Sequence, residues 1–310
     1  MIILYDPHAR EKDAGGWMAT VGFFDGVHRG HRFLIDELRR LADKRGLPAG
    51  IVTFPVHPRT VLQTGYRPKL LNSYEEKLEH LAATGVDYCA VPDFTPALAS
   101  LSAREFITDV LAQQWGVRAL LIGYDHRFGH NRTEGFEQYA VYGAACGMEV
   151  FRVPSFGTAA GAISSSCIRR LLAACRVEEA AQWLTYPYRL KGHVTGGRRI
   201  GRRLGFPTAN IRVDERLKVW PGMGVYAVWA YMAGGVRHKG MLSIGNRPTF
   251  DGEEMAIEVH LLHFNGDLYA QSIEVEFIRY LRPNRKFDSP DALRAQLNDD
   301  RHAADAALEE

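Results

Sequence analysis

The segment Gly22-Phe23-Phe24-Asp25-Gly26-Val27-His28-Arg29-Gly30-His31 decides how the N-terminal half of the chain folds. It begins within an apolar run over residues 18–24 that is typical of a β-strand, and apolar residues repeat at helical spacing behind it. Free backbone N–H groups and the helix dipole favour an anion at such a strand-to-helix turn. The glycines let the backbone approach a ligand closely, and the two histidines can donate hydrogen bonds to phosphate oxygens. The segment therefore predicts a phosphate-binding turn.

The composition is that of a globular protein, because 46% of the 310 residues are apolar and 24% are charged. At ~150 residues per domain, this length suggests two domains. The formal net charge of +2 provides no field for holding a long nucleic acid, whereas a small phosphorylated ligand needs only a local site. We find no signal-peptide pattern and no run near the ~20 apolar residues of a membrane span. We therefore expect a cytoplasmic protein without nucleic-acid or membrane partners.

Four cysteines without a Cys-x-x-Cys pair are expected to be buried, reduced thiols. Over the first 185 residues, short apolar runs alternate with helical patterns. Strands are expected at residues 18–24, 49–54, 86–91 and 119–123, and a helix from about residue 136. The capping boxes Ser73-x-x-Glu76 and Ser102-x-x-Glu105 predict two further helix starts. This alternation predicts an α/β domain over residues 1–185, with a parallel sheet covered by helices.

The pattern changes at about residue 186. Short β-rich segments at residues 225–229, 241–244, 257–261 and 273–277 are separated by Gly, Pro and Asn. We expect a compact antiparallel barrel over residues 186–310. Ser289 as N-cap and Pro290 in the first turn predict one closing helix, and the Ala-rich, acidic tail from His302 is expected to fray.

Four N-terminal segments together resemble the nucleotidyltransferase superfamily, in the form found in prokaryotic bifunctional riboflavin kinase/FAD synthetases. The segment at residues 22–31 is similar to its His-x-Gly-His motif, and residues 52–58 to its Thr-Phe-x-Pro-His-Pro segment. Residues 122–129 and 163–169 resemble its Gly-x-Asp/Asn-x-x-Phe-Gly and Ser-Ser-Thr-x-Ile-Arg segments. The resemblance implies a Rossmann-like domain that adenylylates FMN with ATP, releasing pyrophosphate.

The resemblance also implies roles for single residues. His28, His31 and Arg169 are candidate catalytic groups, which would hold the ATP phosphates and the leaving pyrophosphate. The implied nucleotide-binding residues are Gly22, Phe24, Asp25, Gly26, Gly30, Asp125, Ser164, Ser165 and Ser166. The implied flavin-binding residues are Phe54, His57 and Pro58. Core packing is the alternative for Phe54, an exposed loop acid for Asp125, and a plain helix cap for the serines.

In the second domain, Gly196 to Gly205 contains four arginines among glycines and leads into Phe206-Pro207-Thr208-Ala209-Asn210. Alone, this charge run could be a solvated loop. The string closely resembles the signature of riboflavin kinases, a six-stranded barrel family, so Gly197, Gly201, Arg202, Pro207, Thr208 and Asn210 are candidate nucleotide-binding residues. Thr208 and Asn210, two apart on a strand, would project to one face as a Mg²⁺ site completed by ATP phosphates and water.

Riboflavin's terminal hydroxyl must lose a proton as it attacks the γ-phosphate, and a carboxylate is the expected base. Glu258, Glu274 and Glu276 all lie on predicted strands, and their positions alone do not rank them. Only the resemblance selects Glu258, which matches the catalytic glutamate of the family. The expected function is riboflavin to FMN in the second domain and FMN to FAD in the first.

Two alternatives are a different small-molecule nucleotidyltransferase and a non-catalytic flavin-binding regulator. The kinase signature disfavours the first, and retention of the candidate catalytic residues disfavours the second. The chain departs from the family pattern at Pro55-Val56, which affects the turn before His57, and at Ser166, which replaces a threonine. Cys175 stands where the family commonly has glycine between two helices.

Overall fold

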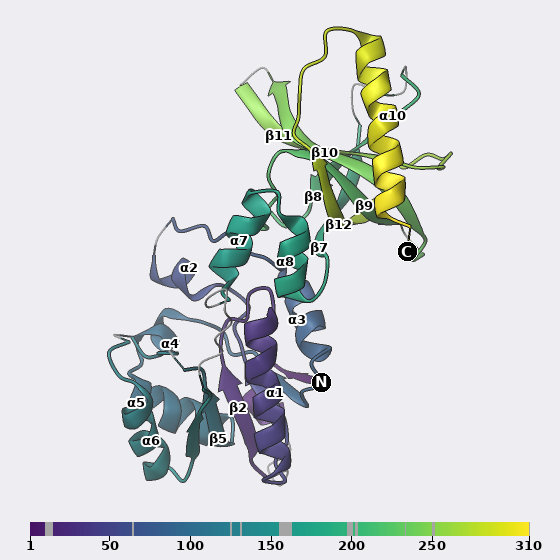
Figure 1. Ribbon diagram of the computed structural model, residues 1–310. Helices are drawn as coiled ribbons and strands as arrows, with labels where there is room; N and C mark the ends of the chain where they lie inside the picture. The colour runs from purple at the N-terminus through teal and green to yellow at the C-terminus, as the bar shows by residue number, and fades with distance from the viewer. Residues whose placement is uncertain are drawn as a thin grey trace. The chain divides into compact units, whose positions relative to one another are not determined.

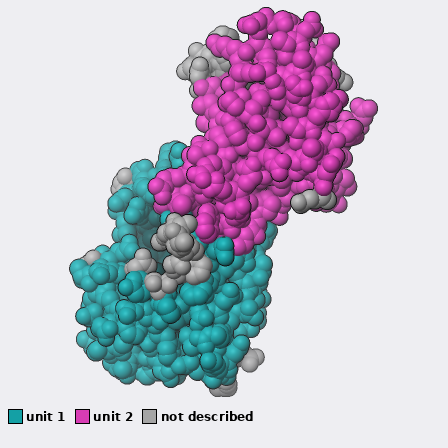
Figure 2. Space-filling view, in the orientation of Figure 1, with its two compact units in different colours: residues 1–164 teal, residues 165–310 magenta. Residues whose placement is uncertain are grey.

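The computed structural model describes residues 1–9, 15–63, 65–124, 126–130, 132–154, 163–196, 201, 204–232, 234–249 and 252–309. The chain folds into two compact units, residues 1–164 and 165–310 (Figure 2). Helices α7 (Ser165–Ala173) and α8 (Val177–Leu184) belong to the second unit, where the Gly222 N–H donates to the Leu172 carbonyl at 2.9 Å. The boundary between functional domains at residues 185 and 186 stays a prediction.

A parallel six-stranded sheet forms the centre of unit 1, as the β-α alternation predicts. Its strands lie in the order β1-β4-β3-β2-β5-β6, and every neighbouring pair is parallel. The strands are β1 (Ile2–Leu4), β2 (Trp17–Val21), β3 (Ala49–Val52), β4 (Tyr88–Ala90), β5 (Val117–Ile122) and β6 (Glu149–Arg152). Strand order reverses between β2 and β5, and in open parallel sheets ligands bind at the carboxyl ends beside such a reversal.

Helices alternate with these strands along the chain, and several of them pack against the sheet. They are η1 (Pro7–Ala9), α1 (Arg29–Asp43), α2 (Pro58–Leu62), α3 (Tyr74–Ala82), α4 (Pro96–Ser100), α5 (Ala103–Glu105), the π-helical η2 (Phe106–Gln114) and α6 (Phe136–Ala145). Both predicted capping boxes are confirmed, with Ser73 and Ser102 each accepting from the backbone of its glutamate partner. Helix α1 runs beside β2 and buries Ile35, Leu38 and Ala42 completely (Figure 1).

Unit 2 contains the predicted antiparallel barrel. Its closed strand order is β10-β11-β8-β7-β12-β9. The strands are β7 (Tyr188–Thr195), β8 (Ala209–Val213), β9 (Gly224–Met232), β10 (Arg237–Thr249), β11 (Gly252–Leu261) and β12 (Ser272–Arg282). Along β7, Tyr188, Leu190 and Val194 are buried and alternate with more exposed residues, as expected of a strand with one face on a core.

Helix α10 (Pro290–Ala307) packs against β9, β10 and β12 of the barrel (Figure 1). Ser289 caps it by accepting from the Ala292 N–H at 3.1 Å, as predicted. The expected fraying from His302 is wrong, because the helix continues to Ala307 and buries Ala304 completely against the barrel. An ion pair of 2.6 Å between Asp305 and Lys239 of β10 adds a second attachment.

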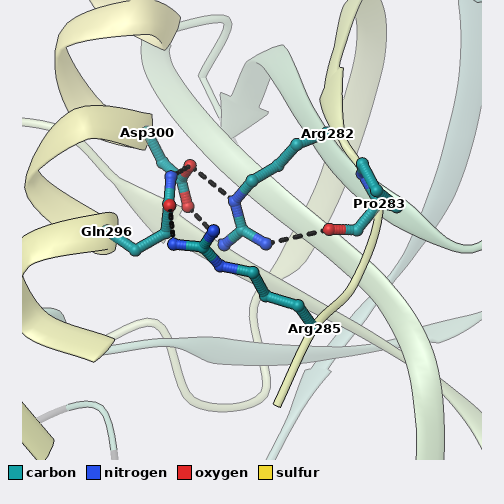
Figure 3. Close-up of polar contacts among 5 residues, drawn as sticks. All are labelled: Arg282, Pro283, Arg285, Gln296 and Asp300. Carbon is teal, nitrogen blue, oxygen red and sulfur yellow. Dashed lines mark hydrogen bonds and ion pairs between the residues drawn. The ribbon is translucent and has the colours of Figure 1, made fainter. Parts of the chain in front are cut away.

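A buried ion pair joins α10 to the end of β12 (Figure 3). Arg282 donates from Nε and Nη2 to the two carboxylate oxygens of Asp300, at 2.7 and 2.6 Å. Gln296 donates to the same carboxylate at 2.8 Å, and its own amide oxygen accepts from Arg285. Asp300 is only 3% exposed, so its charge depends on these partners.

None of the four cysteines forms a disulfide, as expected of reduced thiols, but only Cys89 of the four is buried. Cys146, Cys167 and Cys175 are half-buried, which corrects the expectation of buried thiols for these three. Cys175 has a φ of +63° at the end of α7, a conformation that favours glycine. Cys175 therefore replaces glycine at a position where the left-handed backbone favours glycine.

Candidate active sites

The turn after β2 stacks the two motif histidines. His28 is the N-cap residue of α1 and is 4% exposed. Its ring lies parallel to that of His31, with centroids 3.7 Å apart and an interplanar angle of 16°. Phe24 packs edge-on against His31 at 5.2 Å. The turn has left-handed backbone at Gly26, with a φ of +85°, which explains a glycine there.

The electrostatics of this turn favour a neutral His31. Burial of its ring lowers the pKa of His31 well below its usual range, and the nearby His28 and His126 lower it further. Nδ1 of His31 is buried without a hydrogen-bond partner among the described residues. A neutral imidazole keeps one N–H donor, so a phosphate oxygen would satisfy a group that is otherwise unpaired.

The remaining motif residues form the frame of the turn. A side chain at Gly30 would crowd the His28 ring at 3.3 Å, and one at Gly22 would crowd the Phe24 ring at 3.0 Å. The buried carboxylate of Asp25 accepts from the Leu71 N–H at 2.8 Å. These contacts hold the turn in place, while nucleotide binding by Gly22, Phe24, Asp25, Gly26 and Gly30 stays a prediction.

The predicted flavin segment lies at the carboxyl end of the adjacent strand β3. Phe54 is buried and packs on Phe94, with ring centroids 4.9 Å apart. His57 is the N-cap of α2, where its Nδ1 accepts from the Arg59 N–H at 3.2 Å, and Pro58 is the first helical residue. The His57 ring also contacts Phe23, at 4.8 Å between centroids. The structure thus brings the predicted flavin segment, residues 52–58, against the turn that carries His28 and His31, called the histidine turn below.

The other predicted adenylyltransferase residues are placed less completely. Asp125 lies outside the described residues. Ser164 ends unit 1, whereas Ser165, Ser166 and Arg169 lie on α7 in unit 2, where Arg169 donates to the Ser166 hydroxyl at 3.1 Å. Their approach to His28 and His31 stays a prediction.

The barrel brings the predicted metal ligands and base together. Glu258 on β11 is the direct cross-strand partner of Asn210 on β8. The hydroxyl of Thr208 donates to the Glu258 carboxylate at 3.2 Å. Asn210 is 9% exposed and Thr208 is exposed, so the group lies at the edge of the barrel wall. A hydroxyl, an amide and a carboxylate therefore form one cluster, although they are up to 50 residues apart in sequence.

The structure separates the three strand glutamates that the sequence left unranked. Both Glu274 and Glu276 bind Arg189 on β7, at 3.2 and 2.5 Å. Glu276 also accepts from the Tyr231 hydroxyl at 2.9 Å. These two carboxylates are held by hydrogen bonds and ion pairs between neighbouring strands, with Glu276 buried, and of the three glutamates only Glu258 adjoins the kinase signature.

Part of that signature lies outside the described residues, namely Gly197 and Arg202. Gly201 is described, and an added Cβ there would lie 2.2 Å from the Phe206 carbonyl oxygen, so the close backbone approach requires glycine. Pro207 is exposed, and its carbonyl accepts from Nδ1 of His260 at 2.8 Å. Burial lowers the pKa of His260, so its ring stays neutral and its Nδ1–H can serve as this donor.

The donor set at the barrel cluster suits Mg²⁺. Hydroxyl, amide and carboxylate oxygens are hard ligands, and Mg²⁺ usually binds few protein oxygens together with phosphates and water. Across the described part of the chain, no group of three or more His, Cys, Asp or Glu side chains forms a metal site of protein ligands alone. A metal held by Thr208 and Asn210 would therefore be shared with ATP.

Comparison with known proteins resolves the family. The FAD synthetase family model matches residues 10–167, and the riboflavin kinase family model matches residues 184–308. The curated bifunctional riboflavin kinase/FMN adenylyltransferase of Escherichia coli is 37% identical over 91% of this chain and 90% of its own length. The protein of the same name from Listeria monocytogenes is 38% identical over 91% and 89%. This chain belongs to the bifunctional riboflavin kinase/FMN adenylyltransferase family.

One solved structure extends over the same length. A Streptococcus pneumoniae chain named as a macrolide-efflux protein superposes with a TM-score of 0.87 at 31% identity, covering 98% of both chains. That name describes the S. pneumoniae protein alone. Among the described residues, no helix has the length and apolar character needed to cross a membrane.

Two residues near the motifs of this family were not identified from the sequence. Lys77 is buried on α3 at a core-facing position, four residues before the buried Leu81. His260 follows Glu258 by two residues on β11 and so shares its side of the strand. Two signals could have identified them. Lys77 lies on the apolar stripe of a capped helix, and His260 lies two residues after Glu258 on the same face of a strand.

Proposed function

We propose that this chain phosphorylates riboflavin to FMN in the barrel and adenylylates FMN to FAD in the α/β unit, with ATP as the second substrate of both steps. The family membership supports both activities. The observation that carries the proposal is the cluster of Glu258, Thr208 and Asn210. It places an acid-base group beside a hydroxyl and an amide that can serve as oxygen ligands, and all three residues belong to unit 2.

In the barrel, Glu258 takes the proton of the terminal ribityl hydroxyl as that oxygen attacks the γ-phosphorus of ATP and ADP leaves. Mg²⁺, when bound by Thr208 and Asn210, supplies charge neutralisation for the phosphates. Thr208 donates to the Glu258 carboxylate and so fixes its orientation. His260 holds the Pro207 carbonyl and keeps the signature segment against β11.

In the α/β unit, an FMN phosphate oxygen attacks the α-phosphorus of ATP, and pyrophosphate leaves. The attacking phosphate is already ionised, so alignment and charge stabilisation replace a general base. His28 and His31 donate to the ATP phosphates from the turn after β2. The leaving pyrophosphate is bound by the segment at the start of α7, namely Ser164, Ser165, Ser166 and Arg169. The nucleotide is contacted by Asp125. The flavin is bordered by Phe54, His57 and Pro58.

The setting of both reactions is part of the proposal. We infer that the enzyme works in the cytoplasm, because none of its four cysteines forms a disulfide, which suits a reducing compartment. Its partners are small phosphorylated and flavin substrates rather than nucleic acids, because the net charge is only +2.

Incubation of the purified chain with riboflavin, ATP and Mg²⁺, followed by chromatography of the flavins, tests the proposed function. FMN should appear first and FAD should follow. A second incubation that starts from FMN isolates the adenylylation. Flavin that is bound but not converted would instead identify a non-catalytic flavin-binding protein.

A further inference from the structure

Lys77 is a buried lysine on α3, outside the motifs of either reaction. It is 3% exposed, and its Nζ donates to the Phe54 carbonyl at 2.7 Å. The same ammonium lies 4.1 Å from the centroid of the Phe23 ring, a favourable cation–π distance. Lysines are almost never buried unless paired, and among the described residues the partners here are a carbonyl and two rings, the second being Tyr74 at 5.5 Å, instead of a carboxylate.

The partners of Lys77 belong to the two segments that the adenylylation must align. Phe54 stands at the carboxyl end of β3, in the flavin segment, and Phe23 stands in the histidine turn after β2. The Phe23 ring packs on His57, and the Thr53 hydroxyl donates to the Phe23 carbonyl at 3.3 Å. One ammonium group therefore touches both segments at their junction.

The chain just before α3 holds the same turn at a second point. The backbone N–H groups of Leu71 and Asn72 donate to the Asp25 carboxylate, at 2.8 and 3.4 Å. The capping box of Ser73 then fixes where α3 begins. Residues 71–77 thus brace the histidine turn through Asp25 and through the Phe23 ring.

Stability alone does not account for a lysine here. Burial lowers the pKa of Lys77 to about 8, although the nearby Cys89 and Asp25 oppose this shift. The place of this side chain in the fold therefore disfavours its charged form. A methionine of similar length would fill the space without that desolvation cost. Groups retained against local stability are characteristic of functional sites.

We propose that Lys77 is a positioning residue for adenylyl transfer, which sets the spacing between the nucleotide-binding turn at Phe23 and the flavin segment at Phe54. The inference rests on the proposed adenylylation in this unit. Lys77 acts through these two residues and does not touch the substrates. Its loss should shift FMN relative to the α-phosphorus of ATP, and small misplacements of reacting groups are costly in rate.

The test uses the full chain with Lys77→Met. We expect kcat/KM for FMN in the adenylylation to fall at least about fivefold. The thermal melting temperature should change little, because removal of a desolvated charge offsets loss of the donor to the Phe54 carbonyl, and riboflavin phosphorylation should be unchanged. Lys44→Met, an exposed lysine at the far end of α1, is the matched control and should behave as wild type.

Lys77→Gln is a second variant, which keeps a donor for the Phe54 carbonyl but removes the charge over Phe23. Its loss of kcat/KM should be smaller than that of the methionine variant. A loss below fivefold for Lys77→Met overturns the proposal, as does a loss that only follows the unfolded fraction measured by circular dichroism. Failure of the wild-type chain to make FAD from FMN would instead contradict the proposed function itself.

Discussion

Glu258 differs from the other strand glutamates in its partners. Glu274 and Glu276 both form ion pairs with Arg189, whereas among the described residues Glu258 accepts a hydrogen bond from the Thr208 hydroxyl. Its carboxylate oxygens are hydrogen-bond acceptors next to the kinase signature, where a carboxylate can take the proton of a substrate hydroxyl. Sequence position could not rank the three, because the ranking depends on which strands are neighbours in the closed barrel.

Thr208→Val tests the proposed metal ligand at constant side-chain shape. We expect the Mg²⁺ concentration for half-maximal riboflavin phosphorylation to rise at least about tenfold, because an oxygen ligand and a partner of Glu258 are lost. Titration of the kinase reaction with Mg²⁺ measures this. Adenylylation of FMN by the same variant is the internal control, and an unchanged Mg²⁺ titration would remove Thr208 from the metal site.

His31 predicts an acid sensitivity of unit 1. Its folded pKa is lowered below 6.5 by burial, so below pH 6.5 the unfolded chain binds a proton that the folded chain does not. The contribution of neutral His31 to the free energy of unfolding is fully present above pH 6.5, and it is lost as the pH falls toward the pKa of His31 in the folded chain. Urea unfolding of unit 1 from pH 7 to pH 5 should therefore show a steeper loss of stability for wild type than for His31→Ala. The exposed His8→Ala is the control, and equal slopes for wild type and His31→Ala would contradict this assignment.

At the scale of elements, the sequence predicted the helix starts that are fixed by interactions within one turn. The capping boxes of α3 and α5 and the Ser289 cap are confirmed, because each depends on residues within one turn. The three-residue edge strand β1 carries too little pattern to be recognised, since its pairing with β4 is 86 residues away. The tail after His302 reads as polar, yet Ala304 and Leu308 fall on one face that the barrel covers.

The same distinction explains the candidate sites. The histidine turn and the Phe206–Asn210 signature are contiguous, so sequence could identify them. Lys77 and His260 act on residues 23 and 53 positions away, and their roles appear only when the sheet and the barrel bring distant strands together. The nucleotide-binding roles of the described motif residues stay predictions.

Asp300→Ala tests how α10 is held on the barrel. Removing one partner of a buried ion pair leaves Arg282 uncompensated, so we expect the free energy of unfolding of unit 2 to fall by roughly 3 kcal/mol. Urea unfolding followed by circular dichroism measures it. Asp299→Ala, an exposed carboxylate next to it on the same helix, should cost little. Equal effects of the two substitutions would show that the pair in Figure 3 adds nothing to stability.

At the scale of the whole molecule, the two reactions are predicted to use separate catalytic groups. Unit 1 contains the stacked histidines and the flavin segment, and unit 2 contains the Glu258 cluster. Only the predicted pyrophosphate segment, from Ser164 to Arg169, crosses from one unit to the other. Damage to the barrel cluster should therefore leave adenylylation intact, and damage to the histidine turn should leave phosphorylation intact.

The most direct measurement is a separate assay of each half-reaction on Glu258→Gln and His31→Ala. Glu258→Gln keeps the shape but removes the base, so FMN formation should fall roughly 10²-fold or more, while adenylylation of supplied FMN stays nearly intact. His31→Ala should reduce adenylylation to a similar extent, because it removes a hydrogen-bond donor to the ATP phosphates. Riboflavin phosphorylation should stay near the wild-type rate. Glu274→Gln and His8→Ala are the matched controls. If either Glu258→Gln or His31→Ala abolished both reactions in a folded chain, the assignment of two independent sites would be contradicted.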